Sequence, residues 1–189
     1  LSTHIIARGL LSLGHTVKVI SSGERDSAYE QDGISVRVLP LGLRKKPLFE
    51  KRASKRAARI MQAYISDLAQ YDIIHAHDFR SALMLSELHL PRTVVTARDY
   101  AQICGCTNNI QYTGNINPGC QGTGELWKCH RVYEASWVRK LFRVWQYMYN
   151  SSYRKAEIAS FKHSIFISHA KQEYIENFHD IAGLHARVI

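Results

Sequence analysis

Residues 71–78 read Tyr-Asp-Ile-Ile-His-Ala-His-Asp, a short apolar run that ends in polar side chains. The run predicts a buried strand over residues 71–77. Helical spacing follows over residues 81–89 and stops before Pro91, and residues 93–96 are rich in β-branched side chains. A strand, a helix and a strand in succession imply a right-handed crossover between parallel strands. This unit therefore predicts an α/β fold.

The same alternation continues in both directions along the chain. We expect further strands at residues 16–20, 34–39, 164–167 and 187–189, and helices at 5–13, 49–68, 132–148 and 171–178. The helix over 132–148 is expected to break near 150–152 and to continue to about 161, and the strand over 34–39 to lie near a sheet edge because Pro40 ends it. The predicted architecture is a Rossmann-like parallel sheet with helices on both faces.

Polar side chains follow each predicted strand. Parallel sheets bind ligands at the carboxyl ends of their strands, so these residues are the candidates for a site. They are Ser21, Ser22, His77, Asp78, residues 97–100, Ser168 and His169. Histidine and aspartate in such places can orient hydroxyl groups and exchange protons.

Four segments together resemble a known family. They are Leu-Gly-His-Thr-Val-Lys-Val at 13–19, Asp-Ile-Ile-His-Ala-His-Asp at 72–78, Val-Val-Thr-Ala-Arg-Asp-Tyr at 94–100 and Ile-Phe-Ile-Ser at 165–168. In this order they resemble the N-terminal domain of glycosyltransferase family 4. The resemblance implies a GT-B architecture, in which two Rossmann-like domains face each other across a cleft. It further implies retaining transfer of a sugar from a nucleotide-sugar donor, with the acceptor on the N-terminal domain.

The resemblance also sets expectations about domains. We expect residues 1–189 to form one Rossmann-like N-terminal domain that lacks the family's first strand, its Gly-Gly loop and the C-terminal nucleotide-sugar domain with its paired glutamates. Such a piece would be inactive alone. It would need no cofactor, and its partners would be the donor, bound through the missing domain, and a glycan or lipid-linked acceptor.

The resemblance places substrate contacts at six residues: His77, Asp78, Arg98, Asp99, Tyr100 and Ser168. Arg98 departs from the family, which commonly has histidine in this Thr-x-His-Asp motif. Arginine suits a carboxylate or a phosphate, so the change indicates an acidic acceptor, contact with the donor phosphates, altered specificity or lost activity. Ser168 can also cap the helix that follows it. No residue is assigned a catalytic role.

The positive charge of the chain is concentrated in one segment. The chain has 25 Lys and Arg against 16 Asp and Glu, or +9, and eight basic residues against Glu50 leave +7 in residues 44–59 alone. The eight are Arg44, Lys45, Lys46, Lys51, Arg52, Lys55, Arg56 and Arg59. A cationic amphipathic helix favours docking on an anionic membrane surface, whereas nucleic-acid binding is not expected because no binding motif or interleaved aromatic residues accompany the patch.

The longest apolar run has four residues, at 82–85, far short of the roughly 20 that a membrane-spanning helix needs. We expect a cytoplasmic protein with peripheral membrane contact. The cysteines, Cys104, Cys106, Cys120 and Cys129, lack the spacing of a structural zinc site, so no metal is expected, although zinc binding, disulfide pairing and free thiols all stay open.

Three side-chain expectations concern the interior. His75 is expected to be a buried histidine with a hydrogen-bond partner, on the opposite face of its strand from His77. Trp137, Leu141, Trp145 and Met148 have helical spacing, which favours a core position over sugar stacking.

Two other functions remain alternatives: a non-enzymatic Rossmann-like domain that binds an anionic partner, and a GT-B-type sugar epimerase.

Overall fold

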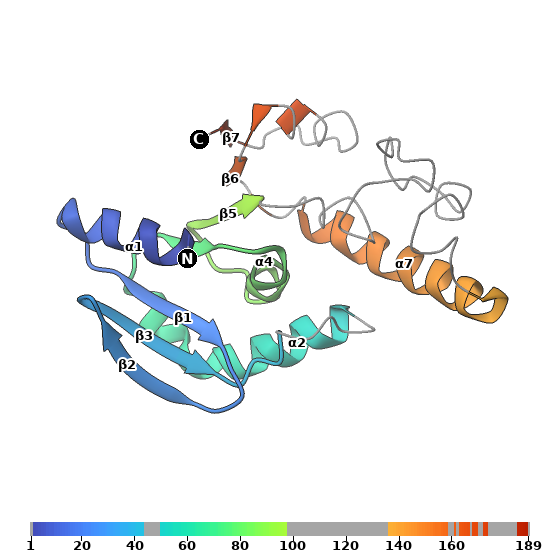
Figure 1. Ribbon diagram of the computed structural model, residues 1–189, viewed down its shortest axis with the longest axis horizontal. Helices are drawn as coiled ribbons and strands as arrows, with labels where there is room; N and C mark the ends of the chain where they lie inside the picture. The colour runs from blue at the N-terminus through green and yellow to red at the C-terminus, as the bar shows by residue number, and fades with distance from the viewer. Residues whose placement is uncertain are drawn as a thin grey trace.

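The computed structural model describes residues 2–43, 50–97, 136–158, 161, 163–166, 168–169, 172–173 and 185–188 (Figure 1). The helices are α1 (Ser2–Ser12), α2 (Glu50–Met61), the 3-10 helix η1 (Gln62–Tyr64), α3 (Ile65–Leu68), α4 (Phe79–Ser86) and α7 (Trp137–Ile158). The strands are β1 (Lys18–Ser22), β2 (Ser27–Gln31), β3 (Ile34–Leu39), β4 (Ile74–Ala76), β5 (Thr93–Ala97), β6 (His163–Phe166) and β7 (His185–Val188).

The strands form two hydrogen-bonded groups, and parallel pairing dominates both. β4, β5, β6 and β7 pair in that order, all in parallel, and β1 pairs in parallel with β3. Helices separate most of the parallel strands along the chain. The α/β class and the Rossmann-like parallel arrangement are thus confirmed.

One strand was missed by the sequence analysis. β2 pairs with β3 in antiparallel register, with Gln31 opposite Ile34. The two residues between them, Asp32 and Gly33, both have positive φ (52° and 75°), as a type I′ hairpin turn requires, and Asp-Gly is a favoured sequence for it. β2 therefore forms the edge of its sheet, and β3, which we expected near the edge, lies between β1 and β2.

The main core lies between β4, β5 and the helices α2 and α4. Its buried side chains include Ala57, Met61, Ala76, Leu85 and Val95. A smaller cluster beneath α1 contains Ala7, Ile34 and Val36. The two clusters hold the parallel strands in place and so fix where β1 and β4 end.

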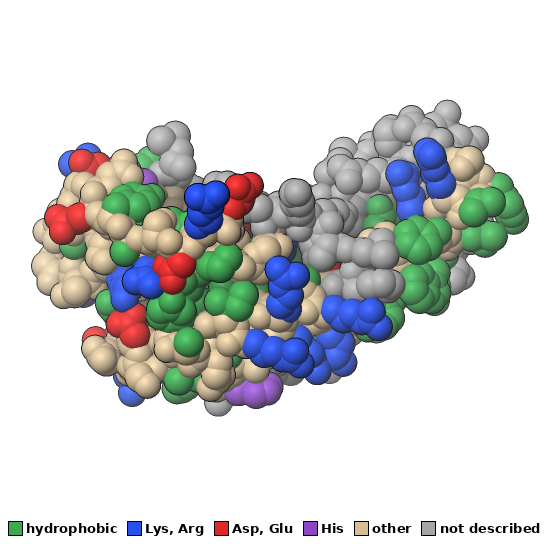
Figure 2. Space-filling view, turned by 90° about the horizontal axis from the view of Figure 1, so that it is seen from below, with side chains coloured by type: hydrophobic (Ala, Val, Ile, Leu, Met, Phe, Trp, Pro, Cys, Tyr) green, Lys and Arg blue, Asp and Glu red, His purple; other side chains and the backbone are tan. Residues whose placement is uncertain are grey.

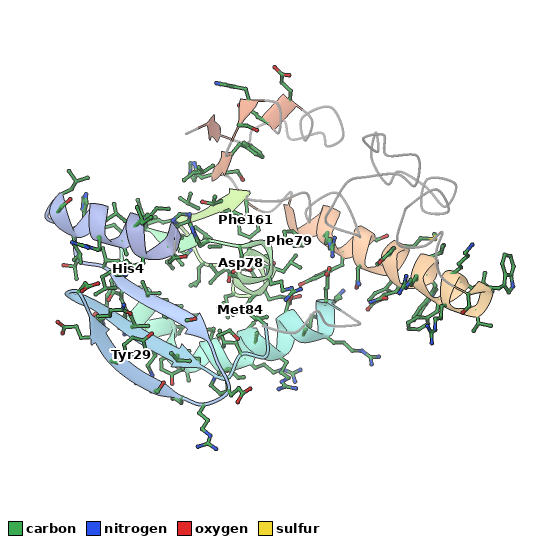
Figure 3. All side chains as sticks on the ribbon, viewed as in Figure 1. His4, Tyr29, Asp78, Phe79, Met84 and Phe161 are labelled. Atoms are coloured by element: carbon green, nitrogen blue, oxygen red, sulfur yellow. The ribbon has the colours of Figure 1, made fainter. Side chains whose placement is uncertain are left out.

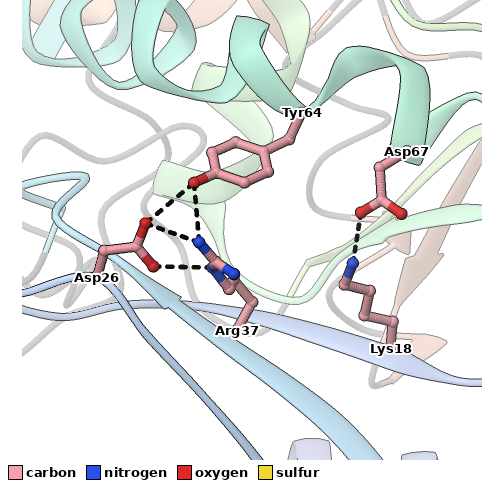
Figure 4. A network of polar contacts seen from close by, with 5 residues as sticks. All are labelled: Lys18, Asp26, Arg37, Tyr64 and Asp67. Carbon is pink, nitrogen blue, oxygen red and sulfur yellow. Dashed lines mark hydrogen bonds and ion pairs between the residues drawn. The ribbon is translucent and has the colours of Figure 1, made fainter.

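Polar contacts join the β2–β3 hairpin to the end of the predicted 49–68 helix (Figure 4). Arg37 pairs with Asp26 at 2.8 Å, and the Tyr64 hydroxyl donates to Asp26 at 3.1 Å. The hydrogen bond from Arg37 is the main cause that lowers the pKa of the Asp26 carboxyl. The helix is not continuous as predicted: it passes from α2 through η1 to α3, and Tyr64 is the residue at the junction with α3.

The predicted break at residues 150–152 is wrong, because α7 runs through it. Asn150 and Ser152 favour turns when their side chains compete for the backbone, but both have partners that are compatible with a helix. The Asn150 side-chain carbonyl accepts from the Glu50 N–H at 3.2 Å, and the Ser152 hydroxyl donates to the Met148 carbonyl at 3.1 Å.

The expected core side of α7 is also wrong. Trp137, Leu141, Trp145 and Met148 are exposed, whereas the buried positions are Val144, Tyr147, Asn150, Tyr153 and Arg154. The side of α7 that packs on the protein is thus partly polar, and its more apolar side faces outward.

Candidate functional site

A cavity of about 740 Å³ runs between β1 and β4, from beneath α1 to the carboxyl ends of both strands. Ser21 and Ser22 reach it from β1, and His75, His77 and Asp78 from β4 and the turn that follows it. Near these strand ends the wall includes Arg80 and Ser81 of α4, Glu50 and Met61 of α2 and Arg154 of α7, and the opposite end of the cavity is lined by apolar residues of α1. The structure therefore brings together two of the polar strand ends that sequence analysis selected.

Asp78 has a structural role that explains its position. It is the N-cap of α4 and lies at the start of that helix (Figure 3). One carboxylate oxygen accepts from the N–H groups of Arg80 and Ser81 at 2.8 and 3.0 Å, and the other from the Ser81 hydroxyl at 2.7 Å. A capping aspartate satisfies N–H groups that the first turn leaves without partners. Asp78 thereby fixes α4 against the end of β4 and turns the chain just after His77.

His75 and His77 lie close together, so the expectation that they occupy opposite faces was wrong. Their ring centroids are 5.4 Å apart in an edge-to-face arrangement. The physical reason is that residues two apart on a strand point to the same side. His77 is half-buried, and both residues line the cavity.

His75 has a partner but is not a buried residue. Its Nε2 lies 2.6 Å from the Thr96 hydroxyl on β5, while the residue as a whole remains exposed. Partial enclosure of the ring lowers the pKa of His75, and the charge of a protonated His77 lowers it further. His75 is therefore held in the neutral form around pH 7, with one ring nitrogen able to accept a hydrogen bond.

A buried ion pair supports the cavity wall where α2 meets α7. Glu50 and Arg154 are only 3% and 2% exposed, and two guanidinium nitrogens of Arg154 contact the two carboxylate oxygens of Glu50, one pair at 2.5 Å. Arg154 also lies over the Phe79 ring, 5.2 Å from its centroid. In the sequence Glu50 stands out only as one acid among many bases, since nothing in sequence spacing links residues about a hundred positions apart.

Of the other predicted substrate contacts, only Ser168 falls within the described residues. It is exposed, follows β6, and does not line the cavity. Because β4, β5 and β6 are parallel neighbours, Ser168 lies on the same edge of the sheet as His77, two strand spacings or roughly 10 Å along it. Arg98, Asp99 and Tyr100 lie outside the described residues, as do all four cysteines.

The described part of the cationic patch is solvent-exposed. Lys51, Arg52, Lys55, Arg56 and Arg59 are all exposed on α2, and Figure 2 shows basic side chains gathered over this helix. Arg44, Lys45 and Lys46 lie outside the described residues. The predicted amphipathicity of this helix is confirmed, since its other face buries Ala57, Ala58 and Met61.

The cavity offers hydroxyl, imidazole and charged groups above an apolar floor. Ile20, Met61, Ala76 and Leu85 contribute apolar lining, and Ser21, Ser81 and the two histidines contribute donors and acceptors. A few polar groups over apolar lining are typical of sites that bind small polar molecules in one orientation. Within the described ranges, no three His, Cys, Asp or Glu residues gather as a metal site, and no helix is long and apolar enough to cross a membrane.

Comparison with known proteins identifies the family. The family model described as Glycosyltransferase Family 4 matches residues 2–189, nearly the entire chain. No curated protein and no solved structure matches it.

Proposed function

Because the chain belongs to glycosyltransferase family 4, we propose that it is the acceptor-binding half of a retaining enzyme that transfers a sugar from a nucleotide-sugar donor. The acceptor is a glycan or a lipid-linked sugar. The donor binds through a second Rossmann-like domain, so residues 1–189 alone are inactive.

The observation that carries this proposal is that the cavity reaches the carboxyl ends of β1 and β4, where polar side chains line it. In open α/β sheets this is where ligands bind. His77 stands at its rim with Ser21 and Ser22 from the neighbouring strand group, and such groups can hold sugar hydroxyls in a fixed orientation. Orientation is a large part of what sugar transfer requires, because it makes the reaction effectively unimolecular.

Each residue of the site has a distinct part in the proposal. His77 hydrogen-bonds the acceptor, and the neutral His75 accepts a hydrogen bond beside it. Asp78 positions His77 through the α4 cap and contributes its remaining acceptor capacity to the substrate. Arg98, Asp99, Tyr100 and Ser168 add contacts along the same rim. Stabilisation of the departing diphosphate belongs to the second domain.

The exposed cations of α2 fit an acceptor that is carried by a membrane. Five basic side chains on one helical face attract anionic headgroups by about 1 kcal/mol each near the surface. We therefore include an anionic membrane surface among the proposed partners. Nucleic acid is not among them.

The test is transfer by the full-length protein. A panel of radiolabelled nucleotide sugars is incubated with membrane-lipid extracts and soluble glycans, and the product is analysed by NMR for its anomeric configuration. The proposal expects transfer with retention. Epimerisation of a nucleotide sugar without any acceptor would favour the epimerase, and absence of both transfer and hydrolysis would favour the non-enzymatic binding domain.

A further inference from the structure

α7 exposes its apolar side, and this side is continuous. Trp137, Val138, Leu141, Phe142, Trp145, Met148 and Tyr149 are all exposed, from 40% to 75%. At about 100° per residue these positions cover about 140° of the helix circumference. They form one stripe from Trp137 to Tyr149, which we call the aromatic stripe.

Neighbouring rings of the aromatic stripe contact one another. The Trp145 ring stacks on Tyr149 with centroids 6.3 Å apart, and Phe142 lies 6.0 Å from Trp145 on the other side. Tryptophan and tyrosine combine a large apolar body with a polar tip, which suits them to a surface that is apolar on one side and wet on the other. A contiguous exposed apolar patch of this kind marks a binding surface.

The surroundings of the stripe are cationic. Between Trp137 and Arg154 the helix has no acidic residue, and Arg139 and Lys140 lie about 60° beyond the two edges of the stripe. α2 has no acid after Glu50, whose carboxylate is occupied by Arg154. Figure 2 shows the basic side chains over α2 and hydrophobic side chains at the far end of α7 on one face of the molecule.

We propose that this face docks on an anionic lipid bilayer, with the aromatic stripe of α7 inserted at the headgroup boundary and the cations of α2 against the lipid phosphates. The occupant follows from charge and shape together: apolar side chains flanked by Lys and Arg match an anionic interface. A second copy of the chain would bring two cationic faces together, which charge repulsion opposes. The proposal deepens the membrane part of the proposed function and assigns the inserted element.

The test is sedimentation of the full-length protein with vesicles of phosphatidylcholine, with and without phosphatidylglycerol. The double substitution Phe142→Ala and Trp145→Ala should lower the partition coefficient on the mixed vesicles by about tenfold or more, because two large aromatic groups no longer leave water. Lys55→Gln with Arg59→Gln should lower it on the order of fivefold per charge, and only on anionic vesicles.

The matched control is Ile5→Ala with Leu13→Ala, which removes two exposed apolar side chains, one from α1 and one from the turn that follows it. It should leave vesicle binding unchanged. The proposal would be overturned if the control variant lost as much vesicle binding as the α7 double variant, or if the α7 double variant lost none. A dimer that dissociates in the α7 variant, without vesicle binding by the wild type, would overturn it in favour of a second copy.

A second readout does not depend on the stability of the alanine variant. Brominated lipids should quench the Trp145 emission, measured as the difference between wild type and Trp145→Phe, which retains an aromatic side chain at that position. Unchanged emission on bound vesicles would contradict insertion. Neither measurement uses a sugar. A negative result for vesicle binding therefore does not contradict the proposed transferase function, and a failure to detect sugar transfer does not contradict membrane docking.

Discussion

α2 and α7 meet at the cavity wall, yet they are amphipathic in opposite senses. α2 buries small apolar residues and Met61 and presents lysine and arginine to water. α7 presents tryptophan, phenylalanine and leucine to the outside and buries Asn150 and Arg154. Both contribute to the cavity, α2 through Glu50 and α7 through Arg154.

The difference teaches that hydrophobic spacing reports the period of a helix but not which side is buried. In α2 the apolar side packs on the core, as burial of apolar area favours. The inward side of α7 is mixed: an ion pair and an amide hydrogen bond hold Arg154 and Asn150 there, and Tyr153 packs in an apolar cluster with two residues of α4. The apolar side is then available to a surface outside the domain.

The largest expected effect is from breaking the ion pair where the two helices meet. Glu50→Ala leaves the buried Arg154 charge without its carboxylate and should lower the free energy of unfolding by about 3–5 kcal/mol. Denaturant unfolding measures this, with the exposed Lys55→Ala on the same helix as the control. Equal costs for the two variants would show that the pair does not hold α7 to α2.

Each helix has one methionine, and truncating each in turn compares the burial of the two helix faces directly. Met61 on α2 is 1% exposed and Met148 on α7 is 45% exposed. Met61→Ala should lower the free energy of unfolding by about 2–5 kcal/mol, since it leaves a cavity, and Met148→Ala by less than about 0.5 kcal/mol. Similar costs, again from denaturant unfolding, would contradict the outward orientation of the α7 stripe.

The helix that packs between them, α4, depends on its cap. Asp78→Ala should lower the free energy of unfolding by about 1 kcal/mol, because two N–H groups of the first turn lose their acceptor. Asp78→Ser retains a capping oxygen and should restore most of the loss. If serine proves no better than alanine, the cap does not explain the stability contribution of Asp78.

The smallest expected effect concerns pH. The pKa of His75 is lowered in the folded protein, so the unfolded chain takes up its proton first as the pH falls. The contribution of His75 to stability is therefore full above about pH 6.5 and is lost as the pH falls from there toward the lowered folded value. Imidazole NMR should give a midpoint below 6.5 that rises in His77→Gln, and a midpoint that does not move would exclude His77 as a cause.

How much the sequence could predict depends on the range of the interaction. β3 was predicted with its observed bounds from local alternation, and the left-handed Gly14 after α1 from its place after an apolar helix, with φ of 86°. The Asp32-Gly33 hairpin was predictable in the same way but was missed. The pairing of Glu50 with Arg154 and the outward side of α7 were not, because both depend on contacts between distant segments.

The same distinction between local signals and contacts between distant segments applies to the candidate site. His77 and Asp78 could be selected because they follow a recognisable strand. The α4 cap was also open to prediction, since an aspartate precedes an apolar helical run. The participation of Glu50 and Arg154 in the wall required the tertiary structure.

The most direct test of the proposed acceptor site is the pair of Michaelis constants of the full-length protein, measured separately for acceptor and donor. His77→Ala should raise the acceptor KM by about tenfold, as expected for a lost hydrogen bond in a partly buried site, and leave the donor KM unchanged. The exposed His15→Ala, outside the cavity, should change neither. An increase in the donor KM alone, or no change in either constant, would contradict the account.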